Sequence, residues 1–246
     1  MTSMIRMVVA AALVLTAGVA WAADPATLTR EQIEQIVREY LVKNPEVVMD
    51  ALRAAQAKQR EAQQQQTVQA IAGSREQLLR DSGSPVGGNV AGDVTVVEFF
   101  DYACPHCKAV ATTVKQLLRD DPKVRLVYKE LPVLGAASVT AARAALAARE
   151  QDKYYAFHDA LMSSTGPLSD AVIFRLAGQV GLDVDRLKQD MASPAVSDAL
   201  KKNTALAQKL GVNGTPAFIV GDDFAPGAVP LGRLKEMVGR ARQGTR

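Results

Sequence analysis

The chain has 246 residues, and its 29 Lys and Arg against 26 Asp and Glu give a formal net charge of +3. No basic cluster stands out, which argues against a nucleic-acid partner. The chain has two cysteines, Cys104 and Cys107. Closing so small a loop adds only about 2 kcal/mol in the chain-entropy model, so chemistry explains this pair better than a structural disulfide does.

The first 22 residues are typical of a secretory signal peptide. Arg6 supplies a positive charge, residues 7–19 are an almost unbroken apolar run, and Ala20-Trp21-Ala22 offers small residues at the cleavage positions. The alternative is a membrane anchor, but the run is shorter than the roughly 20 residues that a span needs. We therefore expect cleavage after Ala22 and export to the periplasm.

Residues 23–81 are predicted to form a helical stalk and linker. Asn44-Pro45 marks a break between two helices, and residues 56–66 are rich in Gln and charge. Two short amphipathic helices cannot form a domain alone, so their apolar faces need a partner. We predict an oligomerisation stalk, and the alternative is packing on the main domain of the same chain. The first helix carries its apolar stripe at Ile33, Ile36, Val37, Tyr40 and Leu41, and the second carries it at Val47, Val48, Ala51, Leu52 and Ala55.

The rest of the chain predicts a mixed α/β domain interrupted by helices. Residues 82–135 are expected to hold a boundary loop at 82–92, strands at 94–100 and 124–128, and a helix between these strands that ends near Leu118. Residues 136–210 have helical character throughout. Residues 211–246 return with a strand at 217–220 and a closing helix at 231–242.

The dithiol Cys104-Pro105-His106-Cys107 lies where the first strand turns into the helix, a thioredoxin-like redox signal. Unpaired N–H groups and the helix dipole there favour a thiolate on Cys104, which we predict to be the exposed nucleophile. Pro105 suits the first helical position, and His106 can stabilise the thiolate further. Cys107 is then the resolving cysteine. Structural zinc needs more ligands than the chain offers here, so no metal site is predicted, although the two thiolates could bind Cu(I).

Two further side chains have competing interpretations. Glu98, six residues before Cys104, is either turned to solvent or buried with a raised pKa, where it could relay the proton of Cys107. His158 lies beside Tyr154, Tyr155 and Phe157 in the helical block. We predict that His158 is a core residue with its polar atoms satisfied.

These motifs together resemble the DsbA-like branch of the thioredoxin superfamily. The resemblance rests on Phe-Phe-Asp-Tyr-Ala-Cys-Pro-His-Cys at residues 99–107, on Glu98, and on Gly-Thr-Pro-Ala-Phe at residues 214–218, and it covers about residues 90–239. It implies a thioredoxin fold with an inserted helical domain, Cys104 as nucleophile, Cys107 as resolving cysteine and Glu98 as a buried acid. It also implies a cis Pro216 against the dithiol, substrate-binding backbone at Thr215, and no cofactor.

Two features differ from a simple monomeric oxidase of that family: the N-terminal extension, and Thr215 where the typical oxidase has valine. Both are similar to oligomeric disulfide isomerases of the suppressor-of-copper-sensitivity protein C type, some of which are trimers. We therefore predict a periplasmic isomerase or reductase that acts on misfolded exported proteins, forms a homo-oligomer, preferably a trimer, and is kept reduced by a membrane redox partner. The alternatives are a dithiol oxidase acting on reduced exported proteins, and a copper-binding or chaperone-like module.

Overall fold

A computed structural model describes residues 28–244, and their contacts divide the chain into two compact units between Ala57 and Lys58. The predicted signal peptide lies outside these residues. Within the described part, no helix is both long enough and apolar enough to cross a membrane.

The N-terminal unit is helical, with α1 at Arg30–Lys43 and the first half of α2, which runs over Pro45–Ala72. Thr29 and Gln32 form a capping box at the start of α1, because each side chain accepts a hydrogen bond from the other residue's backbone N–H. Asn44 ends α1 and Pro45 begins α2, so the predicted break is confirmed. The Gln-rich residues 56–66 belong to α2 without interruption.

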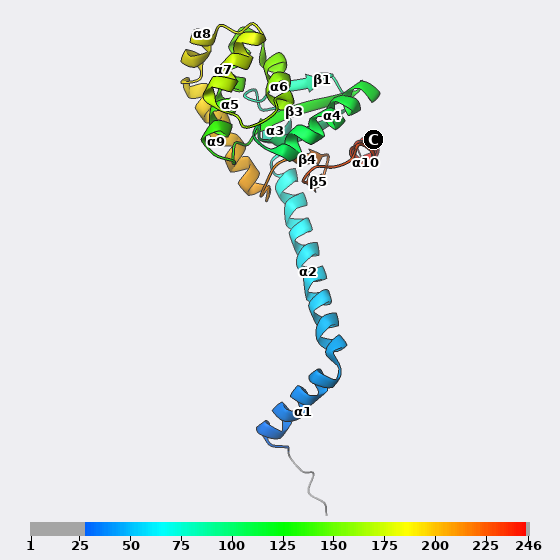
Figure 1. Cartoon of the computed structure of the whole chain (residues 1–246). Coiled ribbons are helices and arrows are strands. Elements are labelled where there is room, and N and C mark those ends of the chain that lie inside the picture. The colour runs from blue at the N-terminus through cyan, green and yellow to red at the C-terminus, as the bar shows by residue number, and fades with distance from the viewer. Residues whose placement is uncertain (1–27, 245–246) are drawn as a thin grey trace, which may run out of the picture. The chain divides into compact units, whose positions relative to one another are not determined.

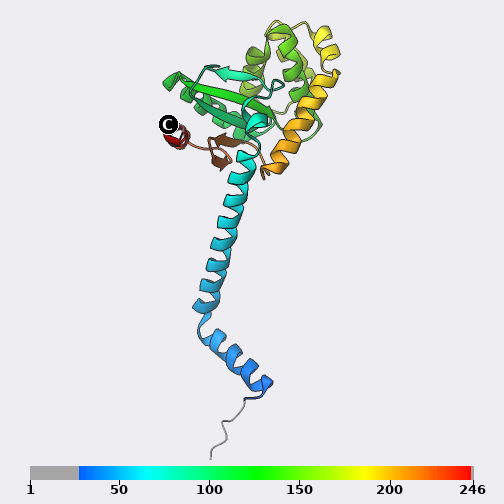
Figure 2. The ribbon, with the colours of Figure 1, turned by 180° about the vertical axis from the view of Figure 1, so that it is seen from behind.

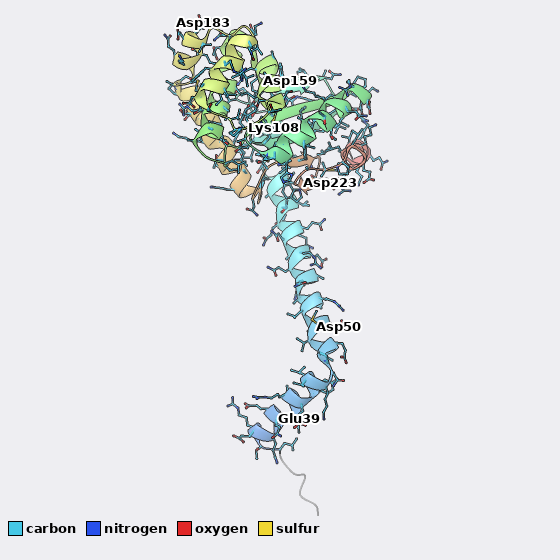
Figure 3. All side chains as sticks on the ribbon, in the orientation of Figure 1. Glu39, Asp50, Lys108, Asp159, Asp183 and Asp223 are labelled. Carbon is cyan, nitrogen blue, oxygen red and sulfur yellow. The ribbon has the colours of Figure 1, made fainter. Side chains whose placement is uncertain are left out.

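The apolar stripe of this unit is exposed. The exposed fractions of Ile36, Val37 and Tyr40 are 54%, 50% and 55%, and α1 has no buried residue. The side chains of Glu39 and Asp50 also stand out from their helices (Figure 3). Isolated helices of this length gain little stability from propensity alone, so these apolar side chains lack the burial that normally stabilises such an element.

The second unit is built on a five-stranded sheet in the order β1-β3-β2-β4-β5 (Figure 1). β2 and β3 are parallel, with Val94 opposite Val124, and every other neighbouring pair is antiparallel. The expected loop at 82–92 contains β1, and β5 was not expected from the sequence. The strands are β1 Val86–Gly88, β2 Val94–Phe100, β3 Val124–Glu130, β4 Ala217–Val220 and β5 Asp223–Pro226.

Helices cover both faces of this sheet (Figures 1 and 2). On one face α4, Pro105–Asp120, and α10, Leu231–Gly244, pack over the even-numbered residues of β2. On the other face α3, Arg75–Leu79, and α9, Pro194–Lys209, pack with the end of α2 over Val97 and Phe99. The buried side chains of Ile71 and Leu78 belong to this second core.

The chain between β3 and β4 is helical, as predicted, and adds its own core to that of the sheet. Small alanine side chains dominate the buried residues of α5, so its neighbours can pack closely against that side of the helix. The insert consists of α5 Ala136–Ala147, a 3₁₀ turn at Ala148–Gln151, α6 Tyr154–Ser163, α7 Asp170–Gln179, α8 Val184–Asp190 and α9.

Candidate active site

The dithiol begins α4. Cys104 is the N-cap residue, with extended backbone angles, and Pro105 follows at the start of the helix where no N–H is needed. The N–H of Lys108 closes the first helical turn on the Cys104 carbonyl at 3.1 Å. The sulfur of Cys104 therefore lies at the positive end of the helix, where a thiolate is stabilised.

Both cysteines are free thiols, and Cys104 is more enclosed than the sequence suggested. Cys104 was expected to be exposed, but its exposed fraction is only 4%, and that of Cys107 is 0%. The loop before β4 explains the difference, because the Thr215 carbonyl lies 3.3 Å from Cys104 Sγ and accepts its hydrogen bond. The Thr215–Pro216 bond is cis, as the resemblance implies.

The two thiols differ in their surroundings. Burial raises the pKa of Cys107, and the Asp101 N–H that donates to its Sγ at 3.5 Å offsets this only in part. Cys107 therefore stays protonated unless a base accepts its proton. This arrangement favours the prediction that Cys104 makes the first nucleophilic attack.

Asp101 is a residue of this site that the sequence analysis missed. Its buried carboxylate accepts hydrogen bonds from the N–H groups of Ala103 at 2.7 Å, Val133 at 2.8 Å and Leu134 at 3.0 Å. It thereby ties the dithiol turn to the segment after β3. The bond to Ala103 is an Asx turn, so an aspartate between a strand and a helix start was the available signal.

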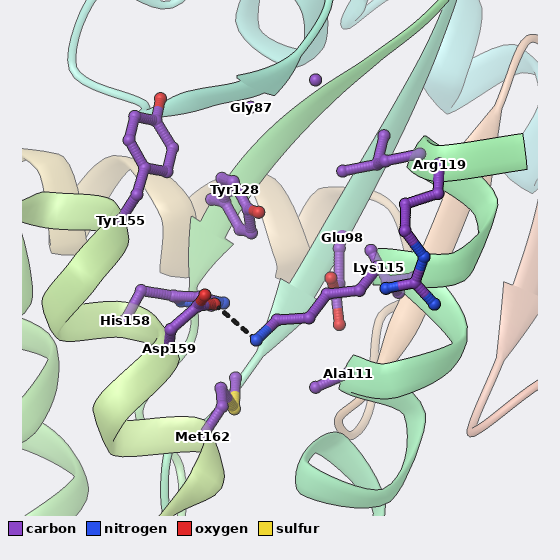
Figure 4. A pocket seen from close by; sticks show the side chains of 13 residues that line it. Gly87, Glu98, Ala111, Lys115, Arg119, Tyr128, Tyr155, His158, Asp159 and Met162 are labelled. Atoms are coloured by element: carbon purple, nitrogen blue, oxygen red, sulfur yellow. Dashed lines mark ion pairs between the residues drawn. The ribbon is translucent and has the colours of Figure 1, made fainter. Parts of the chain in front are cut away.

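Glu98 is buried in β2, with an exposed fraction of 3%, which favours the buried interpretation. Desolvation raises its pKa to about 8. Its side chain points into a cavity of about 300 Å³ that α4 and α6 also line, and the Lys115–Asp159 ion pair, 3.0 Å, spans the same cavity (Figure 4). Within the described residues Glu98 has no hydrogen bond to either cysteine, and neither cysteine lines this cavity.

The two histidines have different settings. His106 is exposed, and across residues 28–244 no hydrogen bond or ion pair involves its side chain, so its effect on the Cys104 thiolate stays a prediction. His158 is buried, and its Nδ1 lies 3.0 Å from the Tyr102 hydroxyl. The prediction of a core histidine is confirmed, with a hydrogen-bond partner at Nδ1.

Comparison with known protein families identifies the family to which this chain belongs. The DSBA-like thioredoxin domain matches residues 95–239, more than half of the chain. The chain belongs to the DsbA-like thiol-disulfide oxidoreductase family. Residues 30–62 match the N-terminal domain of the copper resistance protein ScsC, which corresponds to α1 and the first part of α2.

Solved structures agree with this assignment. A thioredoxin-like oxidoreductase from Silicibacter pomeroyi is 51% identical, with a TM-score of 0.68 over 69% of this chain and 98% of that one. A linker-deletion variant of Proteus mirabilis ScsC is 28% identical, with a TM-score of 0.69 over 90% of this chain and 100% of that one. The fold is therefore thioredoxin-like with an N-terminal helical region.

One curated relative is matched over only a part of its own length. The Na(+)/H(+) antiporter NhaA 1 of Salinispora arenicola is 32% identical over 163 residues, which are 65% of this chain and 25% of the antiporter. The chain thus spans about a quarter of the length of that relative. The similarity therefore concerns only that part of the antiporter.

Proposed function

We propose that the chain is a periplasmic disulfide isomerase or reductase for exported proteins. The observation that carries this proposal is the pairing of Cys104, at the start of α4 beside the Thr215 carbonyl, with the more deeply buried Cys107. One thiol is placed to attack and the other is kept protonated until it is needed. That division of roles is what thiol–disulfide exchange requires.

The chemistry proceeds through a mixed disulfide. The Cys104 thiolate attacks one sulfur of a client disulfide, which forms a Cys104–client bond and releases the other client sulfur as a thiolate. A different client thiolate can then attack the client sulfur of that bond, which isomerises the client and regenerates Cys104. Alternatively Cys107 attacks Cys104, which releases a reduced client and leaves a Cys104–Cys107 disulfide for a membrane redox partner to reduce.

Glu98 supports the second route as the acid–base group for Cys107. With a pKa of about 8, roughly a tenth of the Glu98 carboxyl groups are ionised at pH 7, so both the form that accepts a proton and the form that returns it are present. Its cavity, of about 300 Å³, has room for water beside the Glu98 carboxyl. We assign Glu98 this relay role, with water carrying the proton from Cys107.

Thr215 is proposed to bind the client. Its carbonyl lies beside Cys104, whereas the next carbonyl, that of Pro216, already accepts a bond from the Gly227 N–H at 2.8 Å. A client strand that delivers a disulfide to Cys104 can therefore pair with the backbone of Thr215. Pairing through backbone groups suits an enzyme with many client sequences.

The isomerase role is favoured over the oxidase role by the N-terminal unit. Its exposed apolar stripe is suited to self-association, and we propose a homo-oligomer, preferably a trimer. Several dithiols held together raise the effective concentration of thiols around one misfolded client. An oxidase needs only one encounter with each reduced client.

The test is to compare two forms of the protein on a scrambled, fully oxidised multi-disulfide substrate in a mildly reducing buffer. One form begins at Ala23 and the other at Lys58, because a start at Ser82 would remove the buried side chains of Ile71 and Leu78. Cys104→Ser in the long form is the matched control. Recovery of substrate activity by the long form alone supports the proposal, whereas rapid oxidation of reduced substrate with no recovery by either form identifies an oxidase.

A further inference from the structure

One peptide unit, between Phe100 and Asp101, lies directly beside the resolving cysteine. Its N–H donates to Cys107 Sγ at 3.5 Å, and its carbonyl accepts a hydrogen bond from the Leu131 N–H at 2.8 Å. The N–H and the carbonyl of a trans peptide point in opposite directions, so the positive end of this peptide dipole is directed at the sulfur of Cys107. All four of these residues are buried.

The segment after β3 holds this peptide unit in place. Residues 131–134 are Leu-Pro-Val-Leu, and proline has no N–H. Of the three N–H groups that remain, the first binds the Phe100 carbonyl. The other two, of Val133 and Leu134, donate to Oδ2 of Asp101 at 2.8 and 3.0 Å. The 131–134 segment therefore cannot shift relative to the peptide unit without breaking these hydrogen bonds.

The Asp101 carboxylate also binds the dithiol turn. Its Oδ1 accepts from the Ala103 N–H at 2.7 Å, and the main-chain carbonyl of Asp101 accepts from the Cys104 N–H at 3.1 Å. Asp101 is 1% exposed, and within residues 28–244 no lysine or arginine forms an ion pair with it. Hydrogen bonds from N–H groups to a carboxylate are charge-assisted and strong, so this side chain holds the turn and the 131–134 segment together.

The resolving step needs a thiolate on Cys107. Cys107 transfers its proton to a base, for which Glu98 is proposed. Its sulfur then forms a bond to Cys104 Sγ, and the Cys104–client bond breaks with its electron pair on the client sulfur. Burial opposes the loss of the proton by raising the pKa of Cys107, whereas the hydrogen bond from the Asp101 N–H lowers that pKa. An N–H that already points at the sulfur needs no reorganisation when the charge develops.

We propose that Asp101 is a positioning residue for the resolving step, because its carboxylate, bound to Val133 and Leu134, keeps the N–H of its own peptide directed at Cys107 Sγ. The inference rests on the proposed function in one respect, that Cys107 resolves the mixed disulfide. The first attack belongs to Cys104, whose sulfur is hydrogen-bonded to the Thr215 carbonyl instead. The bonds from Asp101 to the 131–134 segment should therefore act on the second step of the exchange and not on the first.

The test separates the two steps with a small aromatic disulfide whose halves are each released as coloured thionitrobenzoate, with the reduced protein in excess. Attack by Cys104 releases the first half at a rate proportional to the protein concentration. Attack by Cys107 on the resulting mixed disulfide releases the second half at a rate that does not depend on concentration. Stopped-flow absorbance follows both phases, and a mildly acidic buffer slows the second because Cys107 must first lose its proton.

Two substitutions break the bonds to the 131–134 segment and keep an acceptor for Ala103. Asp101→Asn, with its amide oxygen on Ala103, turns an NH₂ group toward the donors of Val133 and Leu134. Asp101→Ser offers a hydroxyl to Ala103 but is too short to reach the segment. Each should slow the second phase at least about tenfold, as expected for a lost hydrogen bond to a charged group, and change the first by less than about twofold. One of the two suffices if the other does not fold.

Asp183→Asn is the matched control. Asp183 also accepts hydrogen bonds from main-chain N–H groups, those of Asp185 and Arg186 at 3.0 Å each, but it caps α8 in the helical insert. This variant should leave both phases unchanged. If the Asp101 variants slow both phases equally, they loosen the fold as a whole and the positioning role is wrong.

The same experiment distinguishes failure of this inference from failure of the proposed function. A parent protein without any concentration-independent phase would show that Cys107 does not resolve the mixed disulfide, which removes the reductase route together with the role of Asp101. A parent protein with a normal second phase that is unaltered in both Asp101 variants would overturn the positioning role alone. Neither result depends on which client proteins the chain acts on.

Discussion

At the scale of single residues, the burial of Glu98 lowers the free energy of unfolding when its carboxyl is ionised, and this loss can be measured. Its folded-state pKa of about 8 lies above the ordinary value of 4.5, so the folded protein binds this proton more tightly than the unfolded chain does. The contribution of Glu98 to the stability of the fold should therefore be most favourable below about pH 4.5 and be lost as the pH rises to about 8. Above about pH 8 this loss of stability no longer changes with pH.

Glu98→Gln removes this dependence. We expect the variant to have a free energy of unfolding about 3 kcal/mol higher than the parent at pH 7, and close to the parent below about pH 4.5, since each pKa unit is worth 1.36 kcal/mol. Urea unfolding of the reduced proteins across that range measures the difference. Glu61→Gln, at an exposed glutamate of α2, is the control and should not change the profile. A difference that does not vary with pH would contradict the assignment.

The residues of the site that the sequence could predict are those with local signals. Cys104, Cys107 and Pro105 lie in one helical turn, so strand-to-helix patterning locates them. Glu98 could be given only as one of two alternatives, because strand alternation does not say which face is buried. Tyr102 and Glu130 carry no local signal, since each is hydrogen-bonded to a side chain of α6, Tyr102 to His158 and Glu130 to Tyr154.

At the scale of elements, the long segments were predicted and the short ones were not. Apolar runs identify β2 and β3 because both are buried, and Asn44-Pro45 locates the break between α1 and α2. β1 has only three residues and no apolar pattern. It exists because it pairs with β3, and Gly87 is needed there because a Cβ would lie 2.9 Å from the Tyr128 ring.

Another element-scale consequence concerns α3. Leu78 is 1% exposed in the core between this short helix and the sheet, whereas its neighbour Leu79 is only partly buried. Leu78→Ala should lower the free energy of unfolding of the form that begins at Lys58 by about 3 kcal/mol, because it leaves a cavity. Leu79→Ala is the matched control with a smaller loss. Equal losses, measured by urea unfolding, would mean that α3 does not hold the sheet as described.

At the scale of the whole molecule, the two units differ in how they use apolar residues. The unit from Lys58 onward buries its apolar side chains in two cores on either side of the sheet. The N-terminal unit leaves its stripe exposed, including Ile33 at 49% and Leu52 at 51%. Contiguous exposed apolar surface on an amphipathic helix is typical of a protein–protein contact, which is why we propose that the N-terminal unit serves self-association.

The stripe itself can be tested with two valines of α1. Val37 lies on the stripe and Val42 lies on the opposite face of the helix, and both are exposed, at 50% and 75%. Val37→Glu should lower the molar mass measured by light scattering to that of a monomer, because a charge placed in an apolar contact is costly. Val42→Glu should leave the mass unchanged. Val37→Glu can be tested further for isomerisation of scrambled substrate and for the reaction of Cys104 with a small disulfide. Loss of the isomerisation with a normal reaction of Cys104 would mean that self-association is needed to isomerise client proteins. An unchanged mass in both variants would place the contact elsewhere.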